Sequence, residues 1–205
     1  VFQFTGLYQG PMDWLTYLGS LLKFELWCFL ALYIHARWQS LRQPYFKPDE
    51  AFQFAASFIT NTNWQGVAGE SAWGNPLWMM GVVFNNFQSA AVGLCVLVVF
   101  ARCFQKKKID GVGNFWQDLW RTFAYILLPL SFVFSLLLVS QGVPQNFKKN
   151  LVIQQYDQTV SLTQTIPMGP FAIQDSIKLL GTNGGSFTQA NGASPIENPT
   201  GFSLF

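Results

Sequence analysis

The sequence predicts an all-α integral membrane protein built from repeats of a spanning helix, a short re-entrant pore helix with its loop, and a second spanning helix. Half of the 205 residues are hydrophobic, and only 11% are charged. The 21 Phe and 8 Trp exceed what a soluble core of this length requires. Two short amphipathic segments, each followed by a Thr/Asn/Gly stretch, alternate with apolar runs long enough to cross a bilayer.

Three apolar runs predict the spanning helices. Residues 77–101 carry no formal charge and would form about 37 Å of helix, which exceeds the hydrocarbon thickness of a bilayer. Residues 122–140 are also uncharged. The run at residues 14–36 is interrupted by Lys23 and Glu25, which project about 200° apart on a helix and therefore face protein or water separately.

Two helices too short to cross the membrane are predicted at residues 49–59 and 170–180. Asp49 is a suitable N-cap for the first helix. Pro170 suits the first position of the second helix, where its missing N–H costs nothing. Helices of this length reach about 16 Å, roughly half of the hydrocarbon thickness. Each helix should therefore end in mid-membrane, where the negative end of its dipole favours a cation.

The stretches after the two short helices are expected to be non-helical loops at membrane depth. They read TNTNW at residues 60–64 and GTNGG at residues 181–185. Aligning their shared TN pairs, Thr62 with Thr182, gives a repeat of 120 residues. Such backbone is tolerated only where protein buries it or where it lines a water-filled path. Asn and Gly accept positive φ, so both loops are able to present backbone carbonyls, as potassium-selective filters do.

Lys and Arg predict the orientation of the spans. The short link between the second and third spans is rich in basic residues: Arg102, Lys106, Lys107, Lys108 and Arg121. Positively charged short loops face the cytoplasm, so the two short helices should open to the outside. Residues 1–13 lack Lys and Arg, whereas basic residues follow the first span, which points the other way. The basic cluster between the second and third spans is the tighter of the two, so we take the orientation that it predicts.

Composition excludes several function classes. Cys28, Cys95 and Cys103 are odd in number, and the first two lie in apolar runs, which favours small core residues over a disulfide framework or metal site. The single histidine, His35, rules out a bis-histidine haem site and makes a Ser/His/Asp triad implausible. A net charge of +2 gives no reason to expect nucleic acid. The chain has no GxxxxGK or DKTGT string, so neither an ATP site nor an intrinsic catalytic site is expected.

Four strings resemble the potassium-binding, channel-like component of the bacterial Kdp-type potassium-transporting ATPase, a member of the potassium-transporter superfamily. They are SFITNTNWQGVAGE at 57–70, FNNFQSAAVG at 84–93, IPMGPFAIQDSIKLLGTNGGSF at 166–187 and ENPT at 197–200. They occur in the family's order, and the resemblance covers nearly the whole chain from about Met12. In that family, four repeats of helix, pore loop and helix surround one potassium filter, and a separate P-type ATPase subunit hydrolyses ATP.

The resemblance implies that both loops bind K+, mainly through backbone carbonyls. The implied filter residues are Asn61, Thr62 and Asn63 in the first loop and Thr182, Asn183 and Gly184 in the second. Gln65 would stand at the outer mouth. The implied partners are a P-type ATPase catalytic subunit, small accessory subunits of the complex and the lipid bilayer. The implied location is the bacterial cytoplasmic (inner) membrane, which the chain would cross several times.

The resemblance also implies two repeats, one at residues 1–112 and an incomplete one at residues 113–205. The third and fourth repeats are absent from the sequence, so we expect a fragment of a longer reading frame. Two loops supply at most half of a fourfold ring. Selective conduction by this chain alone is therefore not expected.

Three functions stay open at this stage. The first is ATP-driven uptake, in which the chain binds extracellular K+ in its filter and delivers it to the ATPase partner. The second is a passive channel or symporter subunit of the same superfamily, which needs no ATPase. The third is a non-conducting membrane assembly protein, which is favoured if the chain is a complete product.

Polar residues inside the helices have simpler interpretations. Asn85, Asn86 and Gln88 in the second span are expected to tie helices together rather than to line a cavity. Asp175 and Lys178 are three residues apart on the second short helix and are expected to pair.

Overall fold

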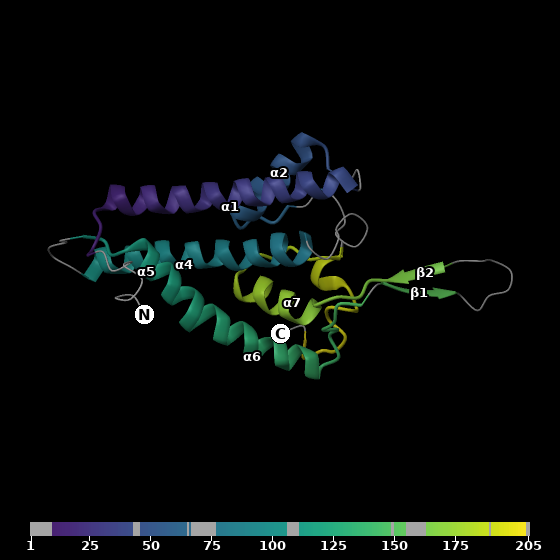
Figure 1. Ribbon diagram of the computed structural model, residues 1–205. Coiled ribbons are helices and arrows are strands. Elements are labelled where there is room, and N and C mark those ends of the chain that lie inside the picture. Colours follow the sequence, from purple (N-terminus) through teal and green to yellow (C-terminus); the bar gives the residue numbers. More distant parts are fainter. Residues whose placement is uncertain are drawn as a thin grey trace.

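The computed structural model describes residues 10–42, 46–64, 66, 77–105, 111–148, 150–154, 163–188 and 190–203. The described chain is mostly helical (Figure 1). Its elements are α1 (Trp14–Arg42), α2 (Pro48–Ile59), the π-helix η1 (Leu77–Val83), α4 (Phe84–Gln105), α5 (Phe115–Arg121), the π-helix η2 (Thr122–Leu127), α6 (Leu128–Ser140), β1 (Leu151–Gln154), β2 (Thr163–Ile166), α7 (Phe171–Leu180) and the 3-10 helix η3 (Asn191–Ala193).

Three helices of the described chain are long and apolar enough to cross a membrane, at Trp14–Leu41, Leu77–Gln105 and Phe115–Ser140. This confirms the predicted fold class, an all-α membrane protein with very little sheet. The first helix continues past the predicted end at Ala36, because the Arg37 side chain is accommodated by donating to the Phe46 carbonyl at 2.7 Å.

The third span also begins earlier than predicted. It starts at Phe115 rather than at Thr122, because the Asn114 side chain caps the helix by accepting from the Gln117 N–H at 3.2 Å. Asp118 then lies inside the helix, where it is buried and paired with Arg102. A prediction based on uncharged runs excludes these first seven residues, about two turns.

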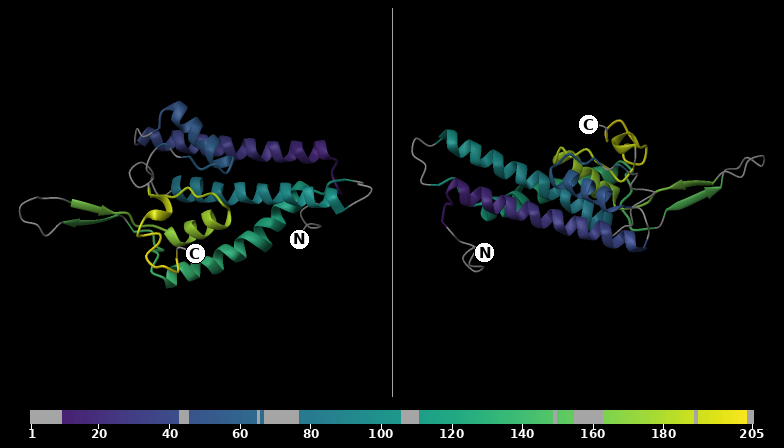
Figure 2. Two further views of the ribbon diagram at one scale, coloured as in Figure 1. Left: turned by 180° about the vertical axis from the view of Figure 1, so that it is seen from behind. Right: turned by 90° about the horizontal axis from the view of Figure 1, so that it is seen from above.

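The long helices form an open bundle, and the second short helix packs between two of them. α1 and α4 run side by side, α2 packs against α1, and α7 lies in the angle between α4 and α6 (Figures 1 and 2). The antiparallel hairpin of β1 and β2, which pairs Leu151 with Ile166, projects from one end of the bundle (Figure 2). This hairpin is not among the elements predicted from the sequence.

Two apolar clusters hold the bundle together. The larger cluster surrounds the short helices and includes Trp78, whose ring stacks on Phe187 at 3.8 Å and meets Phe171 edge-on at 5.0 Å. The smaller cluster lies at the other end of the bundle, where the Tyr17 ring meets the edge of Phe115 at 5.6 Å. The short helices are therefore anchored by large aromatic side chains that leave little freedom to shift.

A charged clamp closes the end of the bundle where α1 starts. The Arg102 guanidinium binds both carboxylate oxygens of Asp118, at 2.5 and 2.7 Å, and also donates to the Val112 carbonyl at 3.1 Å. The Tyr17 hydroxyl donates to Asp118 at 3.2 Å. Gly113 is required beside the clamp, because a Cβ there would overlap the Arg102 guanidinium. Bidentate pairing of this kind fixes both distance and orientation.

Candidate functional site

Both short helices are present, but their first turns differ from the prediction. α2 begins at Pro48, and its N-cap is Lys47, whose backbone N–H donates to the Glu50 carboxylate at 2.8 Å. Asp49 is therefore not the cap. α7 begins at Phe171, so Pro170 is the residue before the helix rather than its first residue. Proline has no N–H to leave unsatisfied at either position.

The backbone after the two helices, loop 1 (residues 60–64) and loop 2 (residues 181–185), follows one pattern. The Thr62 N–H donates to the Ser57 carbonyl at 3.1 Å, and the Asn183 N–H donates to the Lys178 carbonyl at 2.9 Å. These equivalent bonds are 121 residues apart, as are the helix ends at Ile59 and Leu180. The predicted offset of 120 is wrong by one residue, because shared TN letters do not occupy equivalent backbone positions.

Left-handed backbone alternates with ordinary backbone in both loops. Asn61 and Asn63 have φ of 64° and 57° in loop 1, and Thr182 and Gly184 have φ of 56° and 79° in loop 2. The residues between them do not have positive φ. Backbone of this kind belongs to neither a helix nor an extended strand.

The left-handed residues mark the loops as strained. Among the described residues, four other than glycine have positive φ, and three of these lie in loops 1 and 2. Thr182 is β-branched, which makes its left-handed conformation a genuine outlier. Such strain costs about 1–3 kcal/mol per residue and gathers at functional sites.

Side chains join the two loops to each other and to α4. The Asn183 amide donates to the Asn61 side-chain oxygen and to the Ser89 hydroxyl, the latter at 3.0 Å. The Ser89 hydroxyl in turn donates to the same Asn61 oxygen at 2.9 Å. The Asn61 amide completes the set by donating to the Gly181 carbonyl at 3.2 Å. Asn61 and Asn183 are both predicted site residues, whereas Ser89 was not singled out by the sequence analysis.

The loops also touch through their backbones. An ideal Cβ built on Gly185 would lie 2.5 Å from the Asn63 Cβ and 3.1 Å from the Asn63 backbone carbonyl oxygen. Only glycine therefore fits at this contact. Asn63 and Asn183 are buried, whereas Thr62, Thr182 and Gly184 are exposed. The structure therefore brings the two sets of predicted residues to one place.

A cavity of about 620 Å³ lies where both short helices end. Its described lining residues come from four elements and the two loops: Leu22, Glu25, Ile59, Thr60, Asn61, Ser89, Ala90, Val92, Gly93, Leu94, Leu180, Gly181 and Thr182. The C-terminal ends of α2 and α7 both meet this space, so two negative dipole ends share it.

The polar residues at the start of α4 do not line this cavity. The Gln88 amide donates to the Glu25 carboxylate at 2.8 Å and ties α4 to α1, in agreement with the expected role. The Asn85 amide instead donates to the Gly81 carbonyl at 2.6 Å, one turn earlier on the same helical run.

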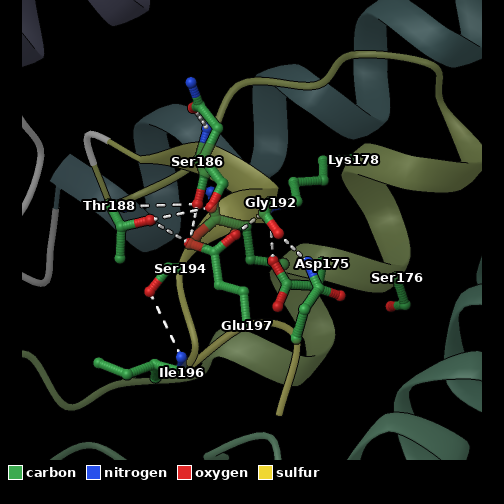
Figure 3. A network of polar contacts seen from close by, with 12 residues as sticks. Asp175, Ser176, Lys178, Ser186, Thr188, Gly192, Ser194, Ile196 and Glu197 are labelled. Atoms are coloured by element: carbon green, nitrogen blue, oxygen red, sulfur yellow. Dashed lines mark hydrogen bonds and ion pairs between the residues drawn. The ribbon is translucent and has the colours of Figure 1, made fainter. Parts of the chain in front are cut away.

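A buried charge network fixes the segment that follows loop 2 (Figure 3). The Lys178 ammonium pairs with the predicted partner Asp175 at 2.8 Å and with Glu197, a partner that the sequence analysis missed. Glu197 also accepts from the hydroxyls of Ser186 and Thr188, the latter at 2.5 Å. The segment that follows loop 2 is thus attached to α7 through Glu197. Breaking a buried network of this kind is strongly destabilising, because a charge is left without its partner.

Some sequence predictions fall outside the described residues. These are the role of Gln65 at the outer mouth and the topology signal of Lys106, Lys107 and Lys108.

These features define an integral membrane protein of long helices, in which two short helices end at one cavity and carry joined, strained loops. The family of the potassium-transporting ATPase A subunit matches residues 1–205, and the chain belongs to this family.

Curated relatives agree with the family match. A Clostridium botulinum protein is 45% identical over 92% of this chain, and a Hydrogenobaculum protein is 45% identical over the same share. A Granulibacter bethesdensis protein is 39% identical over the whole chain. All three are named potassium-transporting ATPase potassium-binding subunit. The chain covers 35 to 37% of their lengths.

Proposed function

We propose that the chain forms part of a potassium-selective membrane subunit that binds extracellular K+ in loops 1 and 2 and delivers it to a P-type ATPase partner for ATP-driven uptake. The observation that carries this proposal is the matched alternation of left-handed residues in both loops, at the ends of two helices that share a cavity. The identity of the ion as K+ is taken from the names of the relatives, which are potassium-binding subunits.

Neutral carbonyl oxygens suit K+ better than other metal ions. A potassium filter replaces the ion's hydration shell with backbone carbonyls, whereas Ca²⁺ and Mg²⁺ prefer sites that include carboxylates. Neither loop contains Asp or Glu. The residues proposed to hold K+, mainly through their carbonyls, are Asn61, Thr62, Asn63, Thr182, Asn183 and Gly184.

The proposal includes an arrangement in the membrane. Residues 1–112 and 113–205 form two repeats, the second of them incomplete, and both short helices enter from the outside of the bacterial cytoplasmic membrane. In this scheme ATP is hydrolysed by the partner subunit, and small accessory subunits complete the complex. The clamp between Arg102 and Asp118 then lies at the cytoplasmic end of the bundle.

The test compares two glycines with similar backbones in the full-length subunit within its ATPase complex. Gly184 has φ of 79° and Gly142 has φ of 99°; a Cβ at Gly184 would meet nothing within 4 Å, and at Gly142 only Pro199 at 4.0 Å. Gly184→Asp introduces a charge and backbone strain into loop 2, whereas Gly142→Asp introduces the same two changes after α6. We expect Gly184→Asp to reduce the preference for K+ over Na+ in cation-stimulated ATP hydrolysis by about tenfold, since left-handed strain alone is worth about 1–2 kcal/mol.

The control variant Gly142→Asp should keep wild-type selectivity. If both variants retain it, loop 2 is not a filter. If the purified complex contains no P-type ATPase, a passive channel subunit replaces the pump subunit as the conclusion.

A further inference from the structure

Glu25 is a carboxylate in the middle of α1 that faces the cavity at the ends of the two short helices. One of its oxygens, Oε1, accepts from the Gln88 amide at 2.8 Å. The other, Oε2, is buried and has no hydrogen-bond partner among the described residues. The neighbouring Lys23 is exposed and projects about 200° away around the helix, so it does not neutralise Glu25.

The surroundings of Glu25 favour a positive charge. Glu25 is the one ionisable side chain among the described residues that line the cavity. The carbonyl ends of α2 and α7 line the same space and add two negative partial charges. An ionised carboxylate without a partner is costly at membrane depth, and a nearby cation removes most of that cost.

The dimensions of the cavity favour a cation that keeps water. Its volume of about 620 Å³ is far larger than the roughly 30 Å³ that one water occupies in the liquid. Small residues, Ala90 and Gly93, contribute to its wall on α4. A single carboxylate does not supply the set of oxygen ligands that Ca²⁺ requires. A hydrated monovalent ion fits both the charge and the space.

We propose that Glu25 is the counter-charge for a hydrated K+ ion held in this cavity, beside the inner ends of α2 and α7. Gln88 holds the carboxylate in place through Oε1, and no described donor neutralises the buried Oε2, so the charge of the carboxylate acts on the ion across the cavity wall. The inference rests on the proposed function, because the ion is taken to arrive through loops 1 and 2.

The experiment locates Tl+, an electron-dense substitute for K+, by anomalous scattering in crystals of the full-length complex. The wild type should show one Tl+ position within the loops and one beside Glu25. Glu25→Gln removes the charge while keeping the shape, and it should reduce the cavity peak by about fivefold or more, leaving the loop peak unchanged. Glu25→Asp keeps the charge and should keep the cavity peak. Asp13→Asn, which removes an exposed carboxylate just before α1, is the matched control and should leave both peaks unchanged.

The outcomes separate this inference from the proposed function. A cavity peak that is missing in the wild type, or unchanged in Glu25→Gln, overturns the role of Glu25. A cavity peak that depends on Glu25 while no ion occupies the loops overturns the filter and leaves the counter-charge standing. If Glu25→Gln fails to assemble, Glu25→Met supplies a neutral variant that suits the apolar neighbours. The absence of a cavity peak in the wild type would still overturn the inference without any variant.

Discussion

The contact between Gly185 and Asn63 gives the sharpest test of whether the two loops act together. Gly185→Ala adds a single methyl group at a position where φ lies outside the left-handed region, so the alanine backbone itself is not strained. The new Cβ would lie 2.5 Å from the Asn63 Cβ. The effect of the substitution is therefore steric and is directed at one neighbour.

The size of the effect follows from this distance. Carbon atoms pack at about 3.5–4.0 Å, so the loops must separate by about 1 Å. Both sides of the contact are backbone or the first atom of a side chain, and neither is able to rotate away. Overpacking of this kind costs about 1–3 kcal/mol. If this free-energy cost is paid only in the ion-bound state of the loops, the affinity for K+ drops by about 5- to 150-fold.

The assay is the K+ concentration that gives half-maximal ATP hydrolysis by the full-length complex, measured together with thermal unfolding. Gly185→Ala should raise this concentration by about fivefold or more. The control is Gly201→Ala, because a Cβ at Gly201 meets nothing within 4 Å and its φ is not left-handed. If Gly185→Ala assembles normally and binds K+ with wild-type affinity, the separation of the loops does not govern binding and the reasoning is wrong.

Three further predictions concern the clamp, the topology and the buried network. Gly113→Ala should displace the Arg102 guanidinium and lower the free energy of unfolding by about 3 kcal/mol, measured by thermal unfolding in detergent. Cys103 is exposed near the end of α4, so a membrane-impermeant maleimide should label it in inside-out vesicles and not in intact cells; labelling of intact cells would reverse the topology. Glu197→Gln removes one carboxylate from Lys178 and should lower the unfolding midpoint, whereas an unchanged midpoint would show that the network adds no stability.

The sequence is sufficient to predict the spanning helices because lipid imposes a simple rule on them. Apolar runs of bilayer length are rare outside membranes, and each of the three predicted runs forms a helix. The helix ends are less predictable, since they depend on partners that are distant in sequence. Asp118 is tolerated inside the third span because Arg102 of α4 pairs with it and Tyr17 of α1 donates to it. The hairpin at β1 and β2 could have been recognised from its Val, Ile and Thr residues.

The loops are predictable in kind but not in register. Asn and Gly mark positions that accept positive φ, and Asn61, Asn63 and Gly184 adopt it. Thr182 does so against its own preference, which no composition rule anticipates. The links that join the loops involve Ser89, which is 28 residues from Asn61 and 94 residues from Asn183 along the chain. The segment that follows loop 2 is secured by Glu197, which is 19 residues from Lys178 and only 11 from Ser186. Only the ENPT string, which contains Glu197, gave a signal for the latter.

The shared oxygen of Asn61 has a further consequence. Asn183 and Ser89 both donate to it, so a movement of either loop changes the hydrogen bonding of the other. In thermodynamic terms the loops are linked by a coupling free energy, and linkage is reciprocal. If an ion bound at one loop raises the affinity of the other loop for a second ion by some factor, an ion at the second loop raises the affinity of the first loop by the same factor. The two helix ends would then respond to an arriving ion as one cooperative unit, although 121 residues separate their equivalent positions.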